Sequence, residues 1–217
     1  MAPAKTSCDW LRWQLADSAF PTGGFAHSSG LEAAWQHDEV RNRADFHGWL
    51  LASLQQVARG QIPWLNMAYQ QPTRLEELDN RCDAFTSNHV ANRASRLQGR
   101  ALLTAAERIF GTAFTPPTLG HFAPIFGVVG RTLEIPHLDT VRLCVYWHLK
   151  GVIAAAVRLN IMGPMEAQGL QHKMGSVAEA VVQRGATYDL DDLAQTNPVQ
   201  ELWQGAHDRL YSRLFQS

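Results

Sequence analysis

Helical periodicity limits the fold of this chain more than any other feature, because it recurs along almost the whole length. Apolar residues fall three and four positions apart in segment after segment, whereas the alternation typical of half-buried strands is almost absent. Ala and Leu dominate the apolar residues, and Pro and Gly separate the segments, as in GTAFTPPT at residues 111–118. The sequence predicts an all-α fold, a single-domain helical bundle of roughly ten helices over residues 1–217.

The most apolar helix is expected at residues 139–160. Its main apolar side chains share one helix face and are Val141, Val145, Leu149, Ile153 and Ala156. The length would suit a membrane span, but the segment also carries groups that are costly in hydrocarbon, namely Arg142, His148, Lys150 and Arg158. The sequence therefore favours a buried helix, with His148 as a hydrogen-bonded imidazole.

Net charge, cysteine spacing and the N-terminal residues indicate which partners and which cellular compartment to expect. Nineteen Lys and Arg residues against twenty Asp and Glu residues give a net charge of −1, so no overall field favours nucleic acid or an anionic membrane. Cys8, Cys82 and Cys144 form no CxxC pair, which argues against a disulfide framework and a zinc knuckle. The start, MAPAKTSCDW, has no apolar core of signal-peptide length. We expect a cytoplasmic protein with neither nucleic acid nor membrane as a partner.

Residues 15–32, LADSAFPTGGFAHSSGLE, look like a turn between two helices with unusual contents. Pro21 ends the preceding helix, and the glycines that follow allow positive φ or the close approach of another backbone. Phe25 and His27 are therefore expected at the tip of a tight loop. Side chains in such a position are often contact points.

Two enzymatic interpretations of this loop fail on spacing. A Walker phosphate-binding loop needs GxxxxGK[ST], but Ser28 and Ser29 follow the glycines with no Lys nearby. A nucleophile elbow needs GxSxG, but Ala26 and His27 stand two residues before the serines. Either serine can instead cap the next helix. No pair of carboxylates is placed for acid and base roles, so we expect no catalytic residue.

Histidines and arginines are the residue types in this chain that could serve as metal ligands or as contact groups for a partner. The nine histidines are scattered and include no HExxH pair, so we expect no metal site. Arg93, Arg96 and Arg100 lie three and four residues apart and so line one helix face. Such a row is typical of a solvated face, and it also suits the carboxylates or phosphates of a partner.

Residues 202–217 are unusually apolar for a terminal segment. At helical spacing they form a broad stripe, with Phe215 close by, made of Leu202, Trp203, Ala206, Leu210, Tyr211 and Leu214. Arg209 and Arg213 lie one turn apart beside it. We expect a helix or tail that either packs on its own domain or docks on a partner.

Both ends of the chain resemble a known family. The stretch at residues 15–32 is similar to LxDSxxPxGGFxHSxGLE, the amino-terminal signature of the urease accessory protein F (UreF) family. GAHDRLYSRLFQS at residues 205–217 resembles the family's closing HExLYSRLFxS. RASRLQGRALL and AVRLNIMGP resemble segments between them, the latter closest to the plant-like branch. The resemblance covers nearly the whole chain in the right order.

This resemblance implies an all-α protein that is no enzyme, has no cofactor and helps to deliver nickel to apo-urease. It also implies a homodimer that joins accessory protein D/H and recruits the GTPase accessory protein G. The GTPase-facing surface would include Phe25, where the family often has Tyr, and Arg213. Asp208 stands where Glu is usual. The partner-binding residues expected from sequence and resemblance together are Phe25, His27, Arg93, Arg96, Arg100, Leu210, Tyr211, Arg213, Leu214 and Phe215.

Two alternatives stay open at this point. In the first, the protein is a GTPase-activating protein that inserts an arginine into its partner's active site, with Arg93, Arg96, Arg100 or Arg213 as the finger. In the second, it carries nickel itself, which the scattered histidines disfavour.

Overall fold

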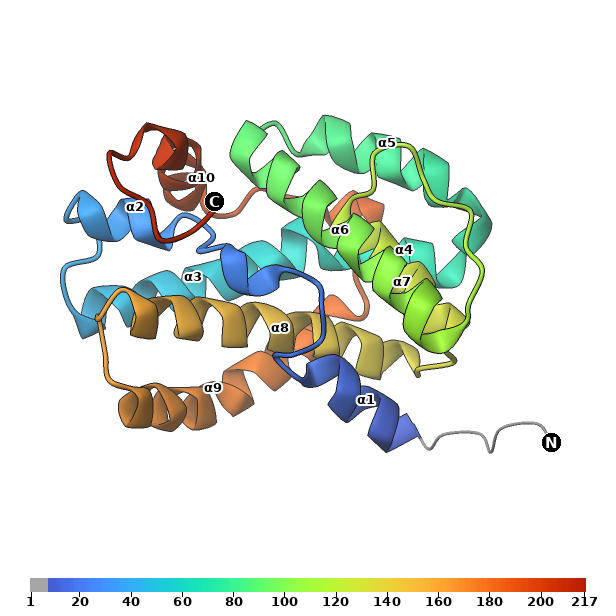
Figure 1. Ribbon diagram of the computed structural model, residues 1–217, viewed down its shortest axis with the longest axis horizontal. Helices are drawn as coiled ribbons and strands as arrows, with labels where there is room; N and C mark the ends of the chain where they lie inside the picture. The colour runs from blue at the N-terminus through green and yellow to red at the C-terminus, as the bar shows by residue number, and fades with distance from the viewer. Residues whose placement is uncertain (1–7) are drawn as a thin grey trace.

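The computed structural model describes residues 8–217, with side chains from Asp9 onward, so the predictions for the start of the chain lie outside it. Within this range the protein has ten α-helices and four short 3-10 helices, and no β-strand (Figure 1). The α-helices are α1 (Cys8–Ala16), α2 (Leu31–Gln36), α3 (Arg43–Gly60), α4 (Ile62–Gln70), α5 (Leu75–Phe85), α6 (His89–Phe110), α7 (Phe122–Thr132), α8 (His137–Arg158), α9 (Pro164–Gly185) and α10 (Pro198–Ala206). The 3-10 helices are η1 (Gly24–Ala26), η2 (Pro72–Arg74), η3 (Leu190–Asp192) and η4 (His207–Arg209). The prediction of an all-α fold is confirmed.

Helix α8 is the centre of the packing. It contacts α1, α2, α3, α4, α7 and α9, and Figure 1 shows it running between α3 and α9 across the middle of the molecule. All five side chains of its predicted apolar stripe are at most 3% exposed. The helix has the length and composition of a membrane span, yet 56% of its most apolar window is buried inside the protein. Its apolar character is therefore explained by the core of the fold.

His148 lies on this central helix as predicted, with a hydrogen-bond partner. Its Nε2 is 3.0 Å from the Oγ of Ser53 on α3. Burial lowers the pKa of His148 to about 4, because the charged imidazolium would lose its hydration. The imidazole is therefore neutral at pH 7.

Side-chain caps fix where two of the long helices begin. The side chain of Asn42 accepts the amide of Asp45 at the start of α3, and that of Asn88 accepts the amide of Val90 at the start of α6. Asp45, which can cap a helix by type, lies inside the first turn, where its carboxylate accepts the amide of Arg41. The helix therefore starts earlier than a cap at Asp45 would allow.

Helices α4 and α7 approach each other closely because Gly127 has no side chain. A Cβ atom at this position would lie 2.3 Å from the carbonyl oxygen of Leu65, which no real contact tolerates. The predicted break at residues 111–118 joins α6 to α7 without helical structure. The residues between this break and α7 are held by Asp79, whose carboxylate accepts the amides of Gly120 and His121.

The C-terminal residues depart from the helical prediction. Helix α10 ends at Ala206, η4 ends at Arg209, and residues 210–217 continue as an irregular segment. The amides of Leu214 and Phe215 donate to the Glu32 side chain, and the amide of Gln216 donates to the carbonyl of Ala26. These donors are used outside the segment, so they cannot close helical turns. Of the two forms expected for residues 202–217, a helix that continues through Leu214 is therefore wrong, and residues 210–217 form a tail.

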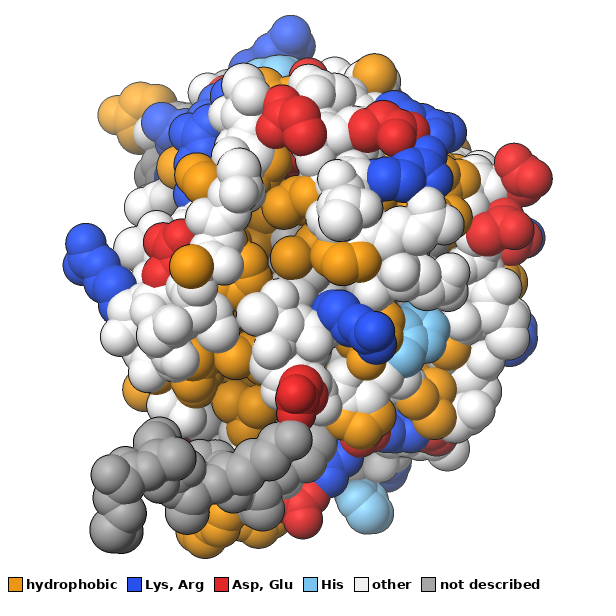
Figure 2. Space-filling view, turned by 90° about the vertical axis from the view of Figure 1, so that its right-hand side faces the viewer, with side chains coloured by type: hydrophobic (Ala, Val, Ile, Leu, Met, Phe, Trp, Pro, Cys, Tyr) orange, Lys and Arg blue, Asp and Glu red, His pale blue; other side chains and the backbone are white. Residues whose placement is uncertain are grey.

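Figure 2 shows the end of the molecule that lies on the right of Figure 1. On this face Lys and Arg side chains are scattered among acidic, neutral and hydrophobic groups. Such a mosaic is in keeping with a net charge of −1. This face carries no single broad basic field of the kind that nucleic acid would favour.

Candidate partner-binding site

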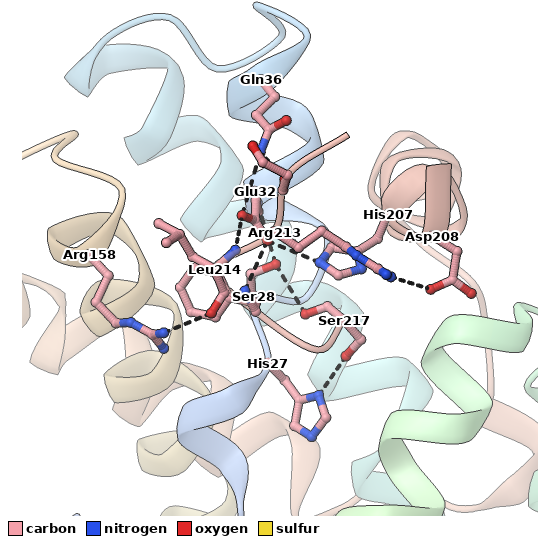
Figure 3. Close-up of polar contacts among 12 residues, drawn as sticks. His27, Ser28, Glu32, Gln36, Arg158, His207, Asp208, Arg213, Leu214 and Ser217 are labelled. Atoms are coloured by element: carbon pink, nitrogen blue, oxygen red, sulfur yellow. Dashed lines mark hydrogen bonds and ion pairs between the residues drawn. The ribbon is translucent and has the colours of Figure 1, made fainter. Parts of the chain in front are cut away.

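The two motifs from opposite ends of the sequence meet in space. We call residues 17–30 the opening loop, residues 207–217 the C-terminal segment, and their joint exterior the composite surface. The amide of Ser28 donates to the carbonyl oxygen of Ser217 at 2.6 Å, and the amide of Gln216 donates to that of Ala26 at 2.7 Å. Figure 3 shows the segment lying across the loop and α2. Phe25 and Arg213 are thereby brought to one region of the molecule.

Glu32, in the first turn of α2, anchors the C-terminal segment from inside. Its Oε1 accepts the amide of Leu214 at 2.6 Å, while its Oε2 accepts that of Phe215 at 3.2 Å and lies 3.0 Å from the Nε2 of His207 (Figure 3). Both Glu32 and His207 are fully buried. A buried carboxylate is tolerated only with several donors, and these contacts supply them.

Gly30 lets α10 approach the base of the opening loop. It occupies the cap position of α2 with a φ of +85°, and a Cβ there would lie 2.9 Å from the amide nitrogen of Gln204. The position therefore requires glycine for two independent reasons. The expected serine cap takes a different form, since Ser28 lies two residues before the cap position and its Oγ accepts the amide of Glu32 at 3.4 Å.

Phe25 is presented on η1 with 65% of its side chain exposed. The guanidinium of Arg158, at the end of α8, lies 4.3 Å from the Phe25 ring centroid and 4.0 Å from that of Phe215. It also donates to the carbonyl of Phe25 at 2.7 Å and to that of Leu214 at 2.9 Å. Arg158 therefore links the opening loop, the C-terminal segment and the central helix.

His27 faces inward, unlike Phe25. Its Nδ1 lies 2.6 Å from the Oγ of Ser217, so the imidazole contributes to holding the C-terminal segment (Figure 3). Burial is the main cause that lowers the pKa of His27 to about 4, and the nearby positive charge of Arg93 adds to it. The expectation of a tip position therefore fits Phe25 better than His27.

Asp208 gathers three basic side chains at the outer side of the C-terminal segment. Its carboxylate accepts two hydrogen bonds from Arg93 on α6, at 2.8 and 3.1 Å. Arg213 reaches it at 3.4 Å, and the Nε2 of His89 also lies 3.4 Å away. The hydrogen bonds from Arg93 are the main reason that the pKa of Asp208 is lowered. Two of the expected partner-binding arginines, Arg93 and Arg213, are thus neighbours.

The apolar residues of the C-terminal segment divide between the core and the solvent. Phe215 is buried, whereas Tyr211 is fully exposed and Leu214 is 60% exposed. Leu210 is half-buried. One large side chain therefore fixes the segment on its own domain, and two others are exposed to solvent.

The remaining expected residues, Arg96 and Arg100, lie farther along α6 and do not join the Asp208 cluster. Arg96 is 4.0 Å from Asp83, and Arg100 donates to the carbonyl oxygen of Leu119. The sequence interpretation overlooked Glu32, Arg158 and His207. The only signal for Arg158 was a charge at the end of the most apolar helix.

A cavity of about 270 Å³ lies between the opening loop, α3, α6 and α8. His27, His148, Cys82 and Cys144 contribute to its lining. Burial lowers the pKa of both imidazoles to about 4 and raises the pKa of both thiols to about 12, so all four groups are neutral at pH 7. Across residues 8–217, His, Cys, Asp and Glu side chains form no group of three that could hold a metal ion.

The structure thus joins two segments from opposite ends of an all-α chain into one exposed surface. A model of the UreF family matches residues 40–175, which is more than half of the chain. The chain therefore belongs to the urease accessory protein F family, a family of accessory proteins and not of urease subunits.

Individual relatives extend the match to both ends. The chain is 36% identical to urease accessory protein F of Arabidopsis thaliana over 99% of this chain and 95% of that protein. It is 35% identical to urease accessory protein F of Oryza sativa subsp. japonica over 95% of this chain and 84% of that protein. Urease accessory protein UreF of Arthrobacter sp. (strain FB24) is 28% identical over 94% and 95%, respectively. The expectation drawn from the two motifs is confirmed at the level of the family.

Proposed function

We propose that this protein is a binding module in the assembly of the nickel centre of urease. In this proposal a cytoplasmic homodimer joins accessory protein D/H and recruits the GTPase accessory protein G to apo-urease. Membership of the family supports a role in urease maturation. The observation that carries the finer proposal is the composite surface, on which Phe25 and Arg213 are exposed and held by neighbouring contacts.

The composition of this surface suits protein recognition. Phe25, Tyr211, Leu214 and Arg213 are exposed, and aromatic and arginine side chains are enriched among the residues that dominate binding energy. Glu32 accepts the backbone amide of Leu214, Arg158 donates to the carbonyls of Phe25 and Leu214, and Gln36 donates to that of Ser212, which lies between Tyr211 and Arg213. A surface that is already ordered loses less conformational entropy when a partner binds.

Capture by a D/H homologue tests the role of the C-terminal segment. Deletion of residues 202–217 should abolish capture, but it also removes buried Phe215, so a point variant is the sharper test. The double variant Tyr211→Ser and Leu214→Ser should fold normally and weaken capture at least about tenfold. Met165→Ser, at a residue 88% exposed on α9, is the matched control. Equal capture of the double variant and the control would refute the proposed contact.

Recruitment of the GTPase tests the loop and Arg213. Phe25→Ala or Arg213→Ala should leave the complex with the D/H protein intact and weaken binding of the GTPase. Trp10→Ala, at an exposed aromatic residue on α1, is the control. Unchanged recruitment by both variants would count against the composite surface as the GTPase-facing site.

Stimulation of GTP hydrolysis distinguishes the alternative of a GTPase-activating protein. The observation that favours it is Arg213, which is 45% exposed and held by Asp208 at 3.4 Å, so it can reach a partner. An arginine finger raises turnover roughly a thousandfold or more. Such a stimulation, lost in Arg213→Ala, would support activation. Binding of the GTPase without stimulation would support recruitment alone.

A further inference from the structure

A basic groove runs along the exposed face of α6. Its volume is about 500 Å³, and its lining includes His89, Arg93, Arg96, Leu97 and Arg100. The three arginines follow one another at intervals of three and four residues, as the sequence predicts for one helix face. At a rise of about 1.5 Å per residue, Arg93 and Arg100 stand about 10 Å apart along the helix axis.

The positive charge of the groove is only partly neutralised. Asp208 pairs with Arg93 at one end, but the carboxylate nearest to Arg96 belongs to Asp83, at 4.0 Å. Asp83 also accepts a hydrogen bond from Asn92 and contacts His121. Within residues 8–217 Arg100 makes no ion pair, and its Nε donates to a backbone carbonyl. Two guanidinium groups are therefore left with most of their donors available.

Asp208 shows how a carboxylate pairs with an arginine that lines this groove. It comes from η4, a separate element, and accepts both terminal nitrogens of Arg93 in a fork at 3.1 and 2.8 Å. This is the geometry in which arginine recognises carboxylates best. Arg96 and Arg100 repeat the same group farther along the helix. Leu97, which is 49% exposed, lies between them in sequence and lines the same groove.

We propose that the α6 groove binds an acidic helical segment of a partner protein. Carboxylates of that segment, spaced three or four residues apart, pair with Arg96 and Arg100, and an apolar side chain between them rests on Leu97. The exposed side chain of Leu97 favours this occupant over a phosphate-rich chain, because an acidic segment of a protein can place an apolar side chain on it and a polyphosphate cannot. The proposal requires only that the chain is a binding protein, and it adds a surface on α6 that adjoins the composite surface at the Arg93–Asp208 pair.

Fluorescence anisotropy with a synthetic peptide tests the groove directly. The probe is a labelled helical peptide with a glutamate, a leucine and a second glutamate on one face, and the matched probe carries glutamine in place of each glutamate. The full-length protein should bind the glutamate peptide in a salt-sensitive manner. Arg96→Gln combined with Arg100→Gln should weaken binding about tenfold or more. Arg108→Gln combined with Lys173→Gln removes the same charge from exposed positions outside the groove and should have little effect.

A second variant distinguishes loss of binding at the groove from misfolding of the protein. Arg100 packs over Gly120, so Arg96→Gln alone serves as a second variant that leaves this packing in place. It should weaken binding severalfold with an unchanged melting temperature. Equal binding of both peptides, equal affinity of groove and control variants, or tighter binding of inorganic polyphosphate than of the glutamate peptide would overturn the proposal. No urease component takes part, so failure here is distinct from failure to capture the D/H protein.

Discussion

Two carboxylates hold the C-terminal segment, and they do so in different environments. Glu32 is fully buried and binds the segment chiefly through the backbone amides of Leu214 and Phe215. Asp208 belongs to the segment itself, has a side chain that is 30% exposed, and is held by arginine. Glu32 therefore fixes the backbone of the segment, whereas Asp208 forms ion pairs at the surface, where water can replace its partners.

The difference has a physical cause. Water cannot replace a lost partner of a buried carboxylate, so a broken contact there costs the full desolvation of the group. At the surface, water and salt solvate both ions when an ion pair opens, so little free energy is lost. The C-terminal segment is thus fixed on its inner side and exposed to solvent on its outer side.

The strongest test of the comparison removes the inner anchor. Glu32→Ala leaves the amides of Leu214 and Phe215 and the ring nitrogen of His207 buried without their acceptor. The free energy of unfolding should fall by about 2–5 kcal/mol, measured by urea denaturation. Glu39→Ala, at an exposed position shortly after α2, should cost less than about 0.5 kcal/mol. Similar losses for both variants would mean that Glu32 is no anchor.

Acidification should lower the stability of the folded state through two histidines, one of which, His27, contacts the C-terminal segment. The pKa values of His27 and His148 are lowered from 6.5 to about 4, so between these values the unfolded chain binds more protons than the folded one. The stability of the folded state is therefore complete above about pH 6.5 and is lost as the pH falls toward 4, by up to about 3 kcal/mol per histidine.

Urea denaturation across this pH range is the measurement, and His27→Gln should flatten the slope. An unchanged slope would exclude His27 as a source of the pH dependence. The pKa of Asp208 is shifted in the same direction but acts in a different pH range: its lowered pKa gives stability that is present above the ordinary carboxyl range and is lost only at lower pH.

A smaller effect is expected where the inner and outer sides meet. Arg158→Ala removes hydrogen bonds to the carbonyls of Phe25 and Leu214 and the contact with the Phe215 ring, which together should contribute about 1–3 kcal/mol. Hydrogen exchange should accelerate at the amides of residues 214–216. Arg158→Lys keeps the charge but not the fork, so it should restore only part of the protection. Arg184→Ala, at an exposed position on α9, is the control. Equal exchange in both variants would contradict the linking role of Arg158.

The smallest effect is expected at the outer anchor. Asp208→Asn removes the charge that Arg93 and Arg213 share, and the free energy of unfolding should fall by less than about 1 kcal/mol. The loss should shrink as the salt concentration rises, because salt already screens the pair. Asp191→Asn, an exposed control, should show neither effect. A large loss that does not depend on salt would mean that Asp208 anchors the segment as strongly as Glu32 does, which would contradict the comparison.

Local patterns in the sequence were sufficient for much of the fold. The stripe on α8 is buried as predicted, because its period matches the helix and its side chains have no polar alternative. Gly23 has a φ of +73°, in keeping with the expected turn. Phe25 is exposed, as a loop tip implies.

Predictions failed where a backbone amide or side chain forms its hydrogen bond with a residue far away in the sequence instead of a neighbouring one. The C-terminal segment has helical spacing at Leu210 and Leu214, yet its amides bind Glu32, a residue about 180 positions away in sequence, and helix formation stops. No local pattern reports such a donor and acceptor pair. His27 likewise turns inward because Ser217 supplies its partner.

The sequence by itself determined the all-α class, the central helix and the two motifs by which the family is recognised. These features depend on the periodicity and order of residues along the chain, which can be read without knowledge of contacts. Only the tertiary structure decided that the motifs form one composite surface, with Glu32 beneath it and Arg158 between its parts. Burial and hydrogen bonding between distant residues set these roles, because the cost of an unpaired buried group depends on what the fold brings to it.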